Sequence, residues 1–313
     1  MDAPILKYDT EVAVSQGDTP HTLLLELTGE NKIVLDVGCA TGNVGKGLVQ
    51  RGCRVVGIEA DAGAAALASP YYETLLVADL DQLDITANLP GAFFDVVIFA
   101  DILEHLKHPA RVLRQVRAQL AGGGYVLASI PNIAHASVSL ALLRGEFRYQ
   151  ELGLLDSTHV RFFTLEGVRD LFEQTGYRLA GIRRVKRGPF ETEIPLKPQD
   201  IPKPVLRFAL QQPEACTYEF VVQACPDSPP SVAACLPKFN GKVLVTTTQG
   251  VASADERLLQ EIQRLSEPYR ELSQLKQQCR YLQSRLSRYQ NLPLLRTARW
   301  IRRKLLRLPD PPY

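Results

Sequence analysis

Four polar side chains in the middle of the chain are of types that can do chemistry. Asp101, Glu104 and His105 follow an apolar run and precede a predicted helix, so their side chains can point into one cleft. Carboxylate and imidazole groups in such a place can orient a polar substrate or remove its proton. His159 lies further along the chain and could act as a base or as a ligand. We predict catalytic roles for Asp101, His105 and His159, with pocket lining or a purely structural role as the alternatives.

A glycine-rich turn lies closer to the N-terminus. The segment D-V-G-C-A-T-G, which begins at Asp36, follows a buried strand pattern and opens a helix. Gly38 and Gly42 allow a tight turn and a close approach of the backbone to a ligand. Three features favour S-adenosylmethionine over a dinucleotide. The Asp36 carboxylate would repel a diphosphate, Ala40 stands where a dinucleotide motif has its second glycine, and Glu59 ends the next strand, where it can accept hydrogen bonds from ribose hydroxyls.

The elements that must position these residues follow an alternating pattern. Apolar, β-branched runs alternate with helical patterns, which predicts an α/β fold with a parallel sheet between helices. The predicted strands are 32–37, 54–58, 74–78, 94–99 and 124–130, and the helices between them are 43–51, 61–68 and 109–120. The glycine run 122–124 is expected to stop the third helix and to turn the chain into the fifth strand.

The pattern changes after residue 131. Helices are predicted at 133–143 and 164–175 and strands at 177–186 and 217–224, with a Pro-rich excursion at 187–215. This order fits a Rossmann-like, mostly parallel seven-stranded sheet whose last strand is antiparallel. We assign residues 1–225 to this domain, 226–250 to a Pro/Ser-rich linker or an extra strand, and 251–313 to a helical tail.

The ordered set of motifs resembles the class I methyltransferases that depend on S-adenosylmethionine, and within them the branch typified by ubiquinone-type O-methyltransferases. The resemblance covers residues 20–185. It is carried by L-D-V-G-C-A-T-G, V-G-I-E at 56–59, A-D-L at 78–80, D-I-L-E-H-L-K-H-P at 101–109, G-G-G-Y-V-L-A-S-I-P-N at 122–132 and H-V-R-F-F-T at 159–164.

The resemblance implies which residues contact the cofactor. Asp36 and Gly38 would hold the methionine end, in a turn completed by Ala40 and Gly42, and Glu59 would hold the ribose. Asp79 would contact the adenine amino group with Leu80 beside the ring, while Ala100 and Asp101 would close the far side. Ala40 departs from the commoner glycine and should narrow the turn slightly. For Asp79, a role as a helix cap is the alternative.

The resemblance also implies a metal. The matching acid-x-x-Glu-His motif binds a divalent cation in ubiquinone-type and small-RNA 2′-O-methyltransferases. The resemblance therefore implies such a cation on Asp101, Glu104 and His105. Many relatives carry E-H-L here without a metal, with the glutamate capping backbone groups and the histidine lining the pocket. The aromatic-rich loop 145–156 is predicted to form a lid over the acceptor, and Arg161 could grip an anionic group.

The last 63 residues differ in charge from the rest of the chain. Residues 251–313 contain 13 Lys and Arg against 6 Asp and Glu. Apolar positions at heptad-like spacing over 258–289 predict a short coiled coil and, through it, a homo-oligomer. Residues 294–308 combine an apolar strip, one Trp and a basic face, which is typical of a helix that contacts a membrane surface, with a solvated or partner-binding helix as the alternative. The acidic first domain and the lack of interleaved aromatic residues disfavour nucleic acid.

The remaining composition bears on location and acceptor. No basic region followed by an apolar run opens the chain, no run approaches the roughly 18 apolar residues of a membrane span, and the six cysteines show no paired spacing. We expect a cytoplasmic protein, peripheral at the inner membrane face. The tail resembles those of bacterial enzymes that modify surface polysaccharides, so our first hypothesis is O-methylation of a sugar or lipid-linked glycan. A small quinone or phenol acceptor and a non-catalytic methyltransferase-like scaffold are the alternatives.

Overall fold

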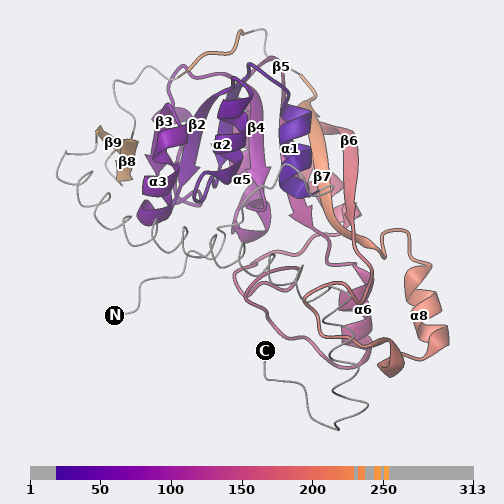
Figure 1. Ribbon diagram of the computed structural model, residues 1–313. Coiled ribbons are helices and arrows are strands. Elements are labelled where there is room, and N and C mark those ends of the chain that lie inside the picture. Colours follow the sequence, from indigo (N-terminus) through magenta and orange to yellow (C-terminus); the bar gives the residue numbers. More distant parts are fainter. Residues whose placement is uncertain (1–18, 229–231, 237–242, 248–249, 254–313) are drawn as a thin grey trace, which may run out of the picture. The chain divides into compact units, whose positions relative to one another are not determined.

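A single mixed sheet organises the chain. The computed structural model describes residues 19–228, 232–236, 243–247 and 250–253. Within them the sheet has the strand order β6-β7-β5-β4-β1-β2-β3-β8-β9 (Figure 1). The strands are β1 (Ile33–Val37), β2 (Arg54–Glu59), β3 (Thr74–Val77), β4 (Phe94–Ala100), β5 (Leu120–Pro131), β6 (Tyr177–Lys186), β7 (Thr217–Pro226), β8 (Val243–Thr247) and β9 (Gly250–Ser253).

The directions of the strands confirm the predicted topology. Strands β1 to β5 pair in parallel, whereas β7 runs antiparallel to both β5 and β6. We assign the stretch 226–250 to a linker or an extra strand. It contributes β8, which joins β3 in parallel and pairs with β9 in an antiparallel hairpin. The predicted seven-stranded sheet is therefore present and is extended by two strands at its β3 edge.

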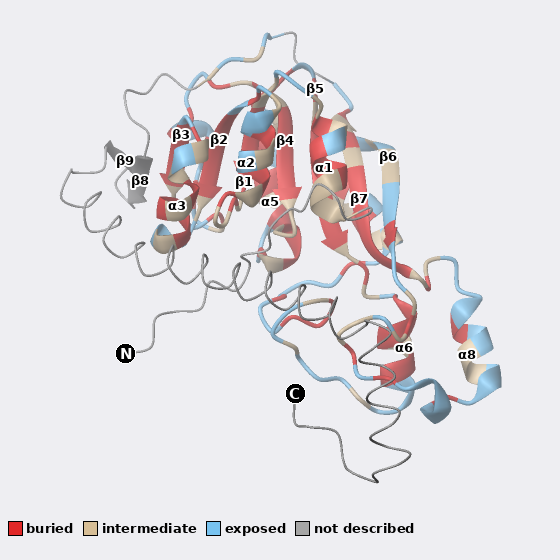
Figure 2. Cartoon of the chain, in the orientation of Figure 1, coloured by how far each residue is buried: buried red, intermediate tan, exposed pale blue. Residues whose placement is uncertain are grey.

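Helices cover both faces of the sheet. They are α1 (Pro20–Thr28), α2 (Asn43–Gln50), α3 (Ala62–Ala68), α4 (Ile85–Asn88), α5 (Pro109–Arg117), α6 (Ala136–Leu143), α7 (Leu165–Glu173) and α8 (Lys203–Leu210), with 3-10 turns η1 (Ser69–Tyr71), η2 (Leu103–His105) and η3 (Pro198–Asp200). One face packs α1, α2 and α3 against residues such as Val34, and the other packs α4, α5 and α7 against residues such as Leu35. Because both faces are covered, the central strands are buried along most of their length (Figure 2).

A third apolar cluster lies beyond the end of the sheet. Helices α6 and α8 pack there with parts of the loop 151–156 and of the Pro-rich excursion (Figure 1). Its buried members are Val138, Leu140, Ala141, Leu154, Leu155, Ile194, Leu196, Ile201, Ala209 and Tyr218. The segment predicted to be a lid is therefore anchored to a small core of its own.

The glycine run 122–124 differs from our prediction. Helix α5 ends at Arg117, and β5 begins at Leu120, so the run lies inside the strand and does not stop the helix. The pairing of β5 with β4 shifts register between Phe94 and Val96, and Gly123 has φ +81°. Glycines at this point permit the irregular backbone of a β-bulge, which is the physical reason for the run.

The predictions for the C-terminal tail cannot be compared with the fold. The predicted coiled coil at 258–289 and the basic helix at 294–308 lie outside the described residues. Among the described residues, no helix is long and apolar enough to cross a membrane. The five described cysteines are free thiols.

Candidate active site

The residues predicted to bind the cofactor gather at one edge of the sheet. The parallel register places Val37 beside both Ile58 and Phe99, and Glu59 beside Val77. Since parallel strands end on the same edge, the segments that follow β1, β2, β3 and β4 meet there. This common edge is what brings residues from four separate motifs into one site.

The turn after β1 has left-handed backbone at three alternate positions. Gly38, Ala40 and Gly42 have φ of +76°, +46° and +84°. A Cβ at Gly38 would overlap the side chain of Ile102, so glycine is required for space as well as for conformation. Left-handed backbone costs an alanine about 1 kcal/mol. At Ala40 a hydrogen bond from its backbone N–H to Glu59 Oε2, at 2.8 Å, offsets that cost.

Glu59 joins the turn to the end of β2. Its Oε1 accepts from the Asp61 N–H at 2.8 Å, while Oε2 accepts from Ala40. Burial raises the pKa of Glu59, and these backbone hydrogen bonds oppose the rise. A carboxylate has about four acceptor positions, so Glu59 retains capacity for a ribose hydroxyl.

Asp36 is fully buried beneath the same turn. The hydroxyl of Tyr72 donates to its Oδ2 at 2.6 Å, whereas Oδ1 is buried without a hydrogen-bond partner among the described residues. Burial raises the pKa of Asp36 to about 7, the Tyr72 hydrogen bond lowers it, and the charge of Glu59 raises it. A buried acceptor of this kind calls for a donor from a ligand.

The segment after β3 contributes Asp79 and Leu80. The Asp79 side chain is exposed and accepts from the Asp81 N–H at 2.9 Å and from Gln82 Nε2 at 3.2 Å. It therefore begins a turn but caps no described helix, since the N-cap of α4 is Asp84, and it remains accessible to a ligand. Leu80 is buried, and Ala100 is half-buried at the end of β4.

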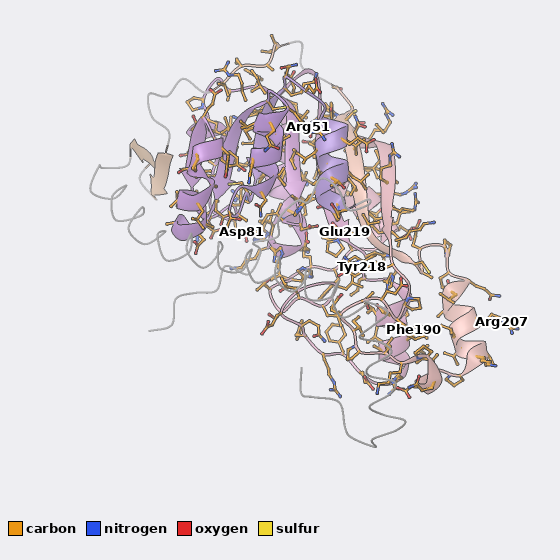
Figure 3. The ribbon with its side chains drawn as sticks, viewed as in Figure 1. Arg51, Asp81, Phe190, Arg207, Tyr218 and Glu219 are labelled. Carbon is orange, nitrogen blue, oxygen red and sulfur yellow. The ribbon has the colours of Figure 1, made fainter. Side chains whose placement is uncertain are left out.

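Acidic side chains converge where β4 and β5 end and β7 begins. Asp101 has left-handed backbone, with φ +51°, and its carboxylate accepts from Ser129 Oγ at 2.8 Å. Glu219 of β7 lies near the end of the sheet, next to Tyr218 (Figure 3). Burial raises the pKa of Glu219 well above its usual value, and the charges of Asp101 and Glu104 raise it further. Carboxyl groups therefore gather at this end of the sheet, with Glu104 and Glu219 buried and Asp101 half-buried.

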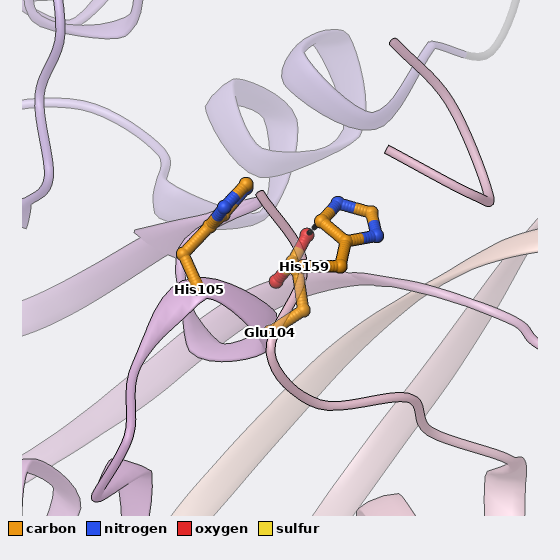
Figure 4. Close-up of side chains that lie close together, drawn as sticks. All are labelled: Glu104, His105 and His159. Carbon is orange, nitrogen blue, oxygen red and sulfur yellow. Dashed lines mark ion pairs between the residues drawn. The ribbon is translucent and has the colours of Figure 1, made fainter. Parts of the chain in front are cut away.

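Glu104, His105 and His159 form a compact cluster beside these acids (Figure 4). One ligand atom from each lies within 4.8 Å of the others, and the two imidazole rings meet edge to face with centroids 4.8 Å apart. His159 Nε2 lies 3.9 Å from Glu104 Oε1. Both Glu104 carboxylate oxygens are buried and lack a hydrogen-bond partner among the described residues. Burial, and then the charge of Asp101, raise the pKa of Glu104 well above its usual value.

The loop that carries His159 is pinned to η2 by its backbone. The N–H groups of Val160 and Arg161 both donate to the Glu104 carbonyl at 3.0 Å. The Arg161 guanidinium donates to the Lys107 carbonyl, from Nε at 3.1 Å. The Arg161 side chain thus braces the loop, and its contact with an anionic group stays a prediction.

A family model described as a methyltransferase domain matches residues 13–180. The chain belongs to this methyltransferase family. Two curated relatives are ubiquinone biosynthesis O-methyltransferases. The one from Paraburkholderia xenovorans (strain LB400) is 28% identical over 174 residues, which cover 54% of this chain and 74% of that protein. The one from Pseudomonas paraeruginosa is 35% identical over 126 residues, which cover 39% of this chain and 53% of that protein.

Solved structures also match the methyltransferase. An S-adenosylmethionine-dependent methyltransferase from Mesorhizobium loti matches with a TM-score of 0.44 and 18% identity over 66% of this chain and 97% of that chain. Magnesium protoporphyrin IX methyltransferase from Synechocystis, with bound S-adenosylhomocysteine, matches with a TM-score of 0.45 and 16% identity over 70% of this chain and 90% of that chain.

The methyltransferase is an enzyme that depends on S-adenosylmethionine, and its own residues fit that cofactor. The left-handed turn at Gly38 to Gly42 brings bare backbone to the edge of the sheet. Asp36 Oδ1 is a buried acceptor with no partner in the part of the chain that the structure describes, and Glu59 retains acceptor capacity. A cationic amino group and a ribose hydroxyl are donors that match these two carboxylates.

The structure regroups the predicted catalytic and metal residues of the methyltransferase. It brings Glu104 and His105 together with His159, whereas the Asp101 carboxylate is engaged by Ser129. His135 lies apart from this cluster: it is buried at the start of α6, where its ring bonds Ser137 and the Arg187 carbonyl.

Sequence reasoning missed two residues of this site. Tyr72 stands in the segment S-P-Y-Y-E (69–73), which gives no signal of its role. Glu219 had a signal, because it is a lone acid inside the apolar run of β7.

Proposed function

We propose that the enzyme methylates a hydroxyl group of a small aromatic acceptor, a phenol or a catechol. The observation that carries this proposal is a chain of rings that leads from the surface to the cluster. Tyr149 and Phe147 have centroids 5.5 Å apart, Phe147 and Phe162 6.3 Å, and Phe162 and His159 6.2 Å. The three non-histidine rings are 59%, 43% and 39% exposed in that order along the chain of contacts.

Exposed aromatic side chains beside a buried polar cluster fit an aromatic acceptor better than a sugar. Rings of this kind stack on planar apolar ligands, and a contiguous apolar patch on a protein surface commonly marks a binding site. Leu152 and Val160, which lie between Tyr149 and Phe162 in the sequence, are also exposed apolar residues. Both curated relatives described above are named for ubiquinone biosynthesis, which agrees with this class of acceptor.

The sugar hypothesis has less support from the described residues. It rested on the tail at 251–313, which lies outside them. The Arg161 guanidinium is tied to the Lys107 carbonyl, and its neighbours on the loop are apolar. We therefore replace our first hypothesis by the small-molecule alternative.

His159 is our candidate for the base that accepts the proton of the acceptor hydroxyl. When bound, S-adenosylmethionine supplies an electrophilic methyl group, so the protein must align the hydroxyl and remove its proton. Burial lowers the pKa of His159, and the charge of His105 lowers it further, so the ring is held in the neutral form that can take up a proton. Removal of a correctly placed base typically costs 10²- to 10⁴-fold in rate, as an order of magnitude.

A divalent cation bound to Glu104, His105 and His159 is the alternative to a role of His159 as the base. The specific observation in its favour is Glu104, whose two buried oxygens lack partners among the described residues and lie beside two imidazoles. Two histidines and one carboxylate form a ligand set that divalent metals accept. A cation held there would lower the pKa of an acceptor hydroxyl and would favour a catechol, which offers two oxygens, over a phenol.

A methyl-transfer assay tests the acceptor class. Purified enzyme is offered catechols, monohydroxy phenols and nucleotide sugars with S-adenosylmethionine. We expect turnover of the aromatic acceptors and a loss of about 100-fold or more in kcat for His159→Gln. His108→Gln, on the surface at the start of α5, is the matched control. Turnover of nucleotide sugars alone would reject the aromatic acceptor.

An experiment with a chelator distinguishes a bound cation from a role of His159 as the base. Enzyme is dialysed against EDTA, its metal content is measured, and Mn²⁺ binding is followed by calorimetry for wild type and Glu104→Gln. Full activity in EDTA together with no Mn²⁺ binding would exclude a role for a cation, and His159 would remain the candidate base. Loss of activity in EDTA, restored by Mn²⁺ in wild type but not in Glu104→Gln, would establish the cation.

A further inference from the structure

Tyr72 lies beneath the glycine-rich turn, inserted between α2 and β2. Its side chain is almost fully buried, at 3% exposure. A Cβ at Gly45 of α2 would overlap the Tyr72 hydroxyl, and a Cβ at Gly57 of β2 would overlap its ring. Glycine in the interior of a helix costs about 1 kcal/mol relative to alanine. Two elements therefore accept glycine at the positions where this ring needs space.

The ring ends on a carboxylate of the cofactor site. The Tyr72 hydroxyl donates to Asp36 Oδ2 at 2.6 Å, across 36 residues of sequence. The other oxygen, Oδ1, is buried and has no partner among the described residues. Asp36 lies at the end of β1, just before the left-handed turn, so one of its oxygens is occupied and the other receives no donor from the described residues, as expected of an oxygen that binds a ligand.

We propose that Tyr72 is a positioning residue of the cofactor site, which holds Asp36 so that Oδ1 receives the cationic amino group of the methionine portion of S-adenosylmethionine. This inference concerns the cofactor and does not depend on the aromatic acceptor proposed above. It assigns Tyr72, Gly45 and Gly57 to one device that aims a single carboxylate oxygen.

The electrostatics of the pocket agree with this role. The ionisable groups that face Asp36 are Tyr72, Cys39 and Glu59. Burial and the charge of Glu59 disfavour the ionised carboxylate, while the Tyr72 hydrogen bond favours it. Because a cationic amino group pairs with the ionised form, loss of the Tyr72 hydroxyl should weaken binding twice, through orientation and through protonation.

The test uses two ligands that differ at the methionine end. Affinities of S-adenosylhomocysteine, which carries the amino acid portion, and of 5′-methylthioadenosine, which lacks it, are measured by calorimetry for wild type and Tyr72→Phe. A hydrogen bond to a charged group corresponds to about a tenfold change or more in affinity. We expect a loss of about 10-fold for S-adenosylhomocysteine and none for 5′-methylthioadenosine.

Two controls keep the outcome decisive. Tyr177→Phe removes another buried tyrosine hydroxyl, which donates to the Leu113 carbonyl, and should leave both affinities unchanged. Asp36→Asn keeps an acceptor for Tyr72 but cannot ionise, so it should bind S-adenosylhomocysteine weakly. This variant tests the proposal independently, should Tyr72→Phe fail to fold. Equal losses for both ligands in Tyr72→Phe, or wild-type affinity in Asp36→Asn, would overturn the proposal.

The pH dependence of binding gives a second readout. In wild type the affinity for S-adenosylhomocysteine should fall as the pH drops through about 7, where Asp36 takes up a proton. In Tyr72→Phe the fall should begin at higher pH, because the hydrogen bond that favoured the ionised carboxylate is gone. An identical pH profile in the two proteins would contradict a positioning role.

Discussion

Substitution of Asp36 by asparagine should make the ligand-free protein more stable at high pH while it weakens the cofactor site. The pKa of Asp36 is raised from its ordinary value of 3.8 to about 7, first of all by burial. Between these two values the folded protein retains a proton that the unfolded chain has lost, so the stability of wild type falls as the pH rises. The asparagine side chain cannot ionise, and its carbonyl can still accept the Tyr72 hydroxyl.

The magnitude follows from the two pKa values of Asp36. At 1.36 kcal/mol for each pH unit of separation, wild type loses about 1.5 kcal/mol at pH 5 and about 4 kcal/mol at pH 8 relative to strongly acidic solution. The advantage of Asp36→Asn over wild type should therefore grow by about 2–3 kcal/mol from pH 5 to pH 8. Urea unfolding of both ligand-free proteins at the two pH values measures this difference.

Asp170→Asn, on the exposed face of α7, is the matched control and should show no comparable change with pH. A stability difference between wild type and Asp36→Asn that stays the same from pH 5 to pH 8 would refute the reasoning. It would mean that Asp36 is already ionised in the folded protein, and that burial does not dominate its environment.

Three further changes probe other parts of the site. Ala40→Gly should raise the free energy of unfolding by up to about 1 kcal/mol, because it removes the cost of left-handed backbone, and urea unfolding measures it. Glu193→Ala removes the acceptor of the Leu154 N–H (2.6 Å) and of the Tyr218 hydroxyl (2.9 Å). It should speed hydrogen exchange in the loop around Leu154 and lower stability by about 1–3 kcal/mol; unchanged exchange would show that the apolar cluster alone anchors the loop. Phe147→Ala should raise KM for a phenol several-fold and change kcat little, and an unchanged KM would place the acceptor elsewhere.

Much of the fold followed from local patterns. The β-branched runs predicted β1 to β4 nearly to the residue, because a strand buried on both faces must be apolar throughout. The edge that holds the site followed from the same pattern, since consecutive parallel strands must end together. The glycine run 122–124 misled the prediction, because glycine serves a β-bulge as well as a helix end and sequence does not separate the two.

The partners of the site residues were decided by tertiary structure. The sequence singled out Asp36, Glu104 and His159, since acids and histidines beside strand ends are uncommon outside sites. It could not show that Tyr72 takes one oxygen of Asp36, or that Glu219 of β7 joins Asp101.

These contacts depend on packing and on strand register. The contact of Glu219 with Asp101 requires the antiparallel register of β7 on β5, and the contact of Tyr72 with Asp36 requires a space left by two glycines. Residue types and spacing determined that a cofactor-binding methyltransferase domain is present. Which side chain holds which was determined only when distant segments packed together, because the energies of those contacts arise from burial that no local pattern records.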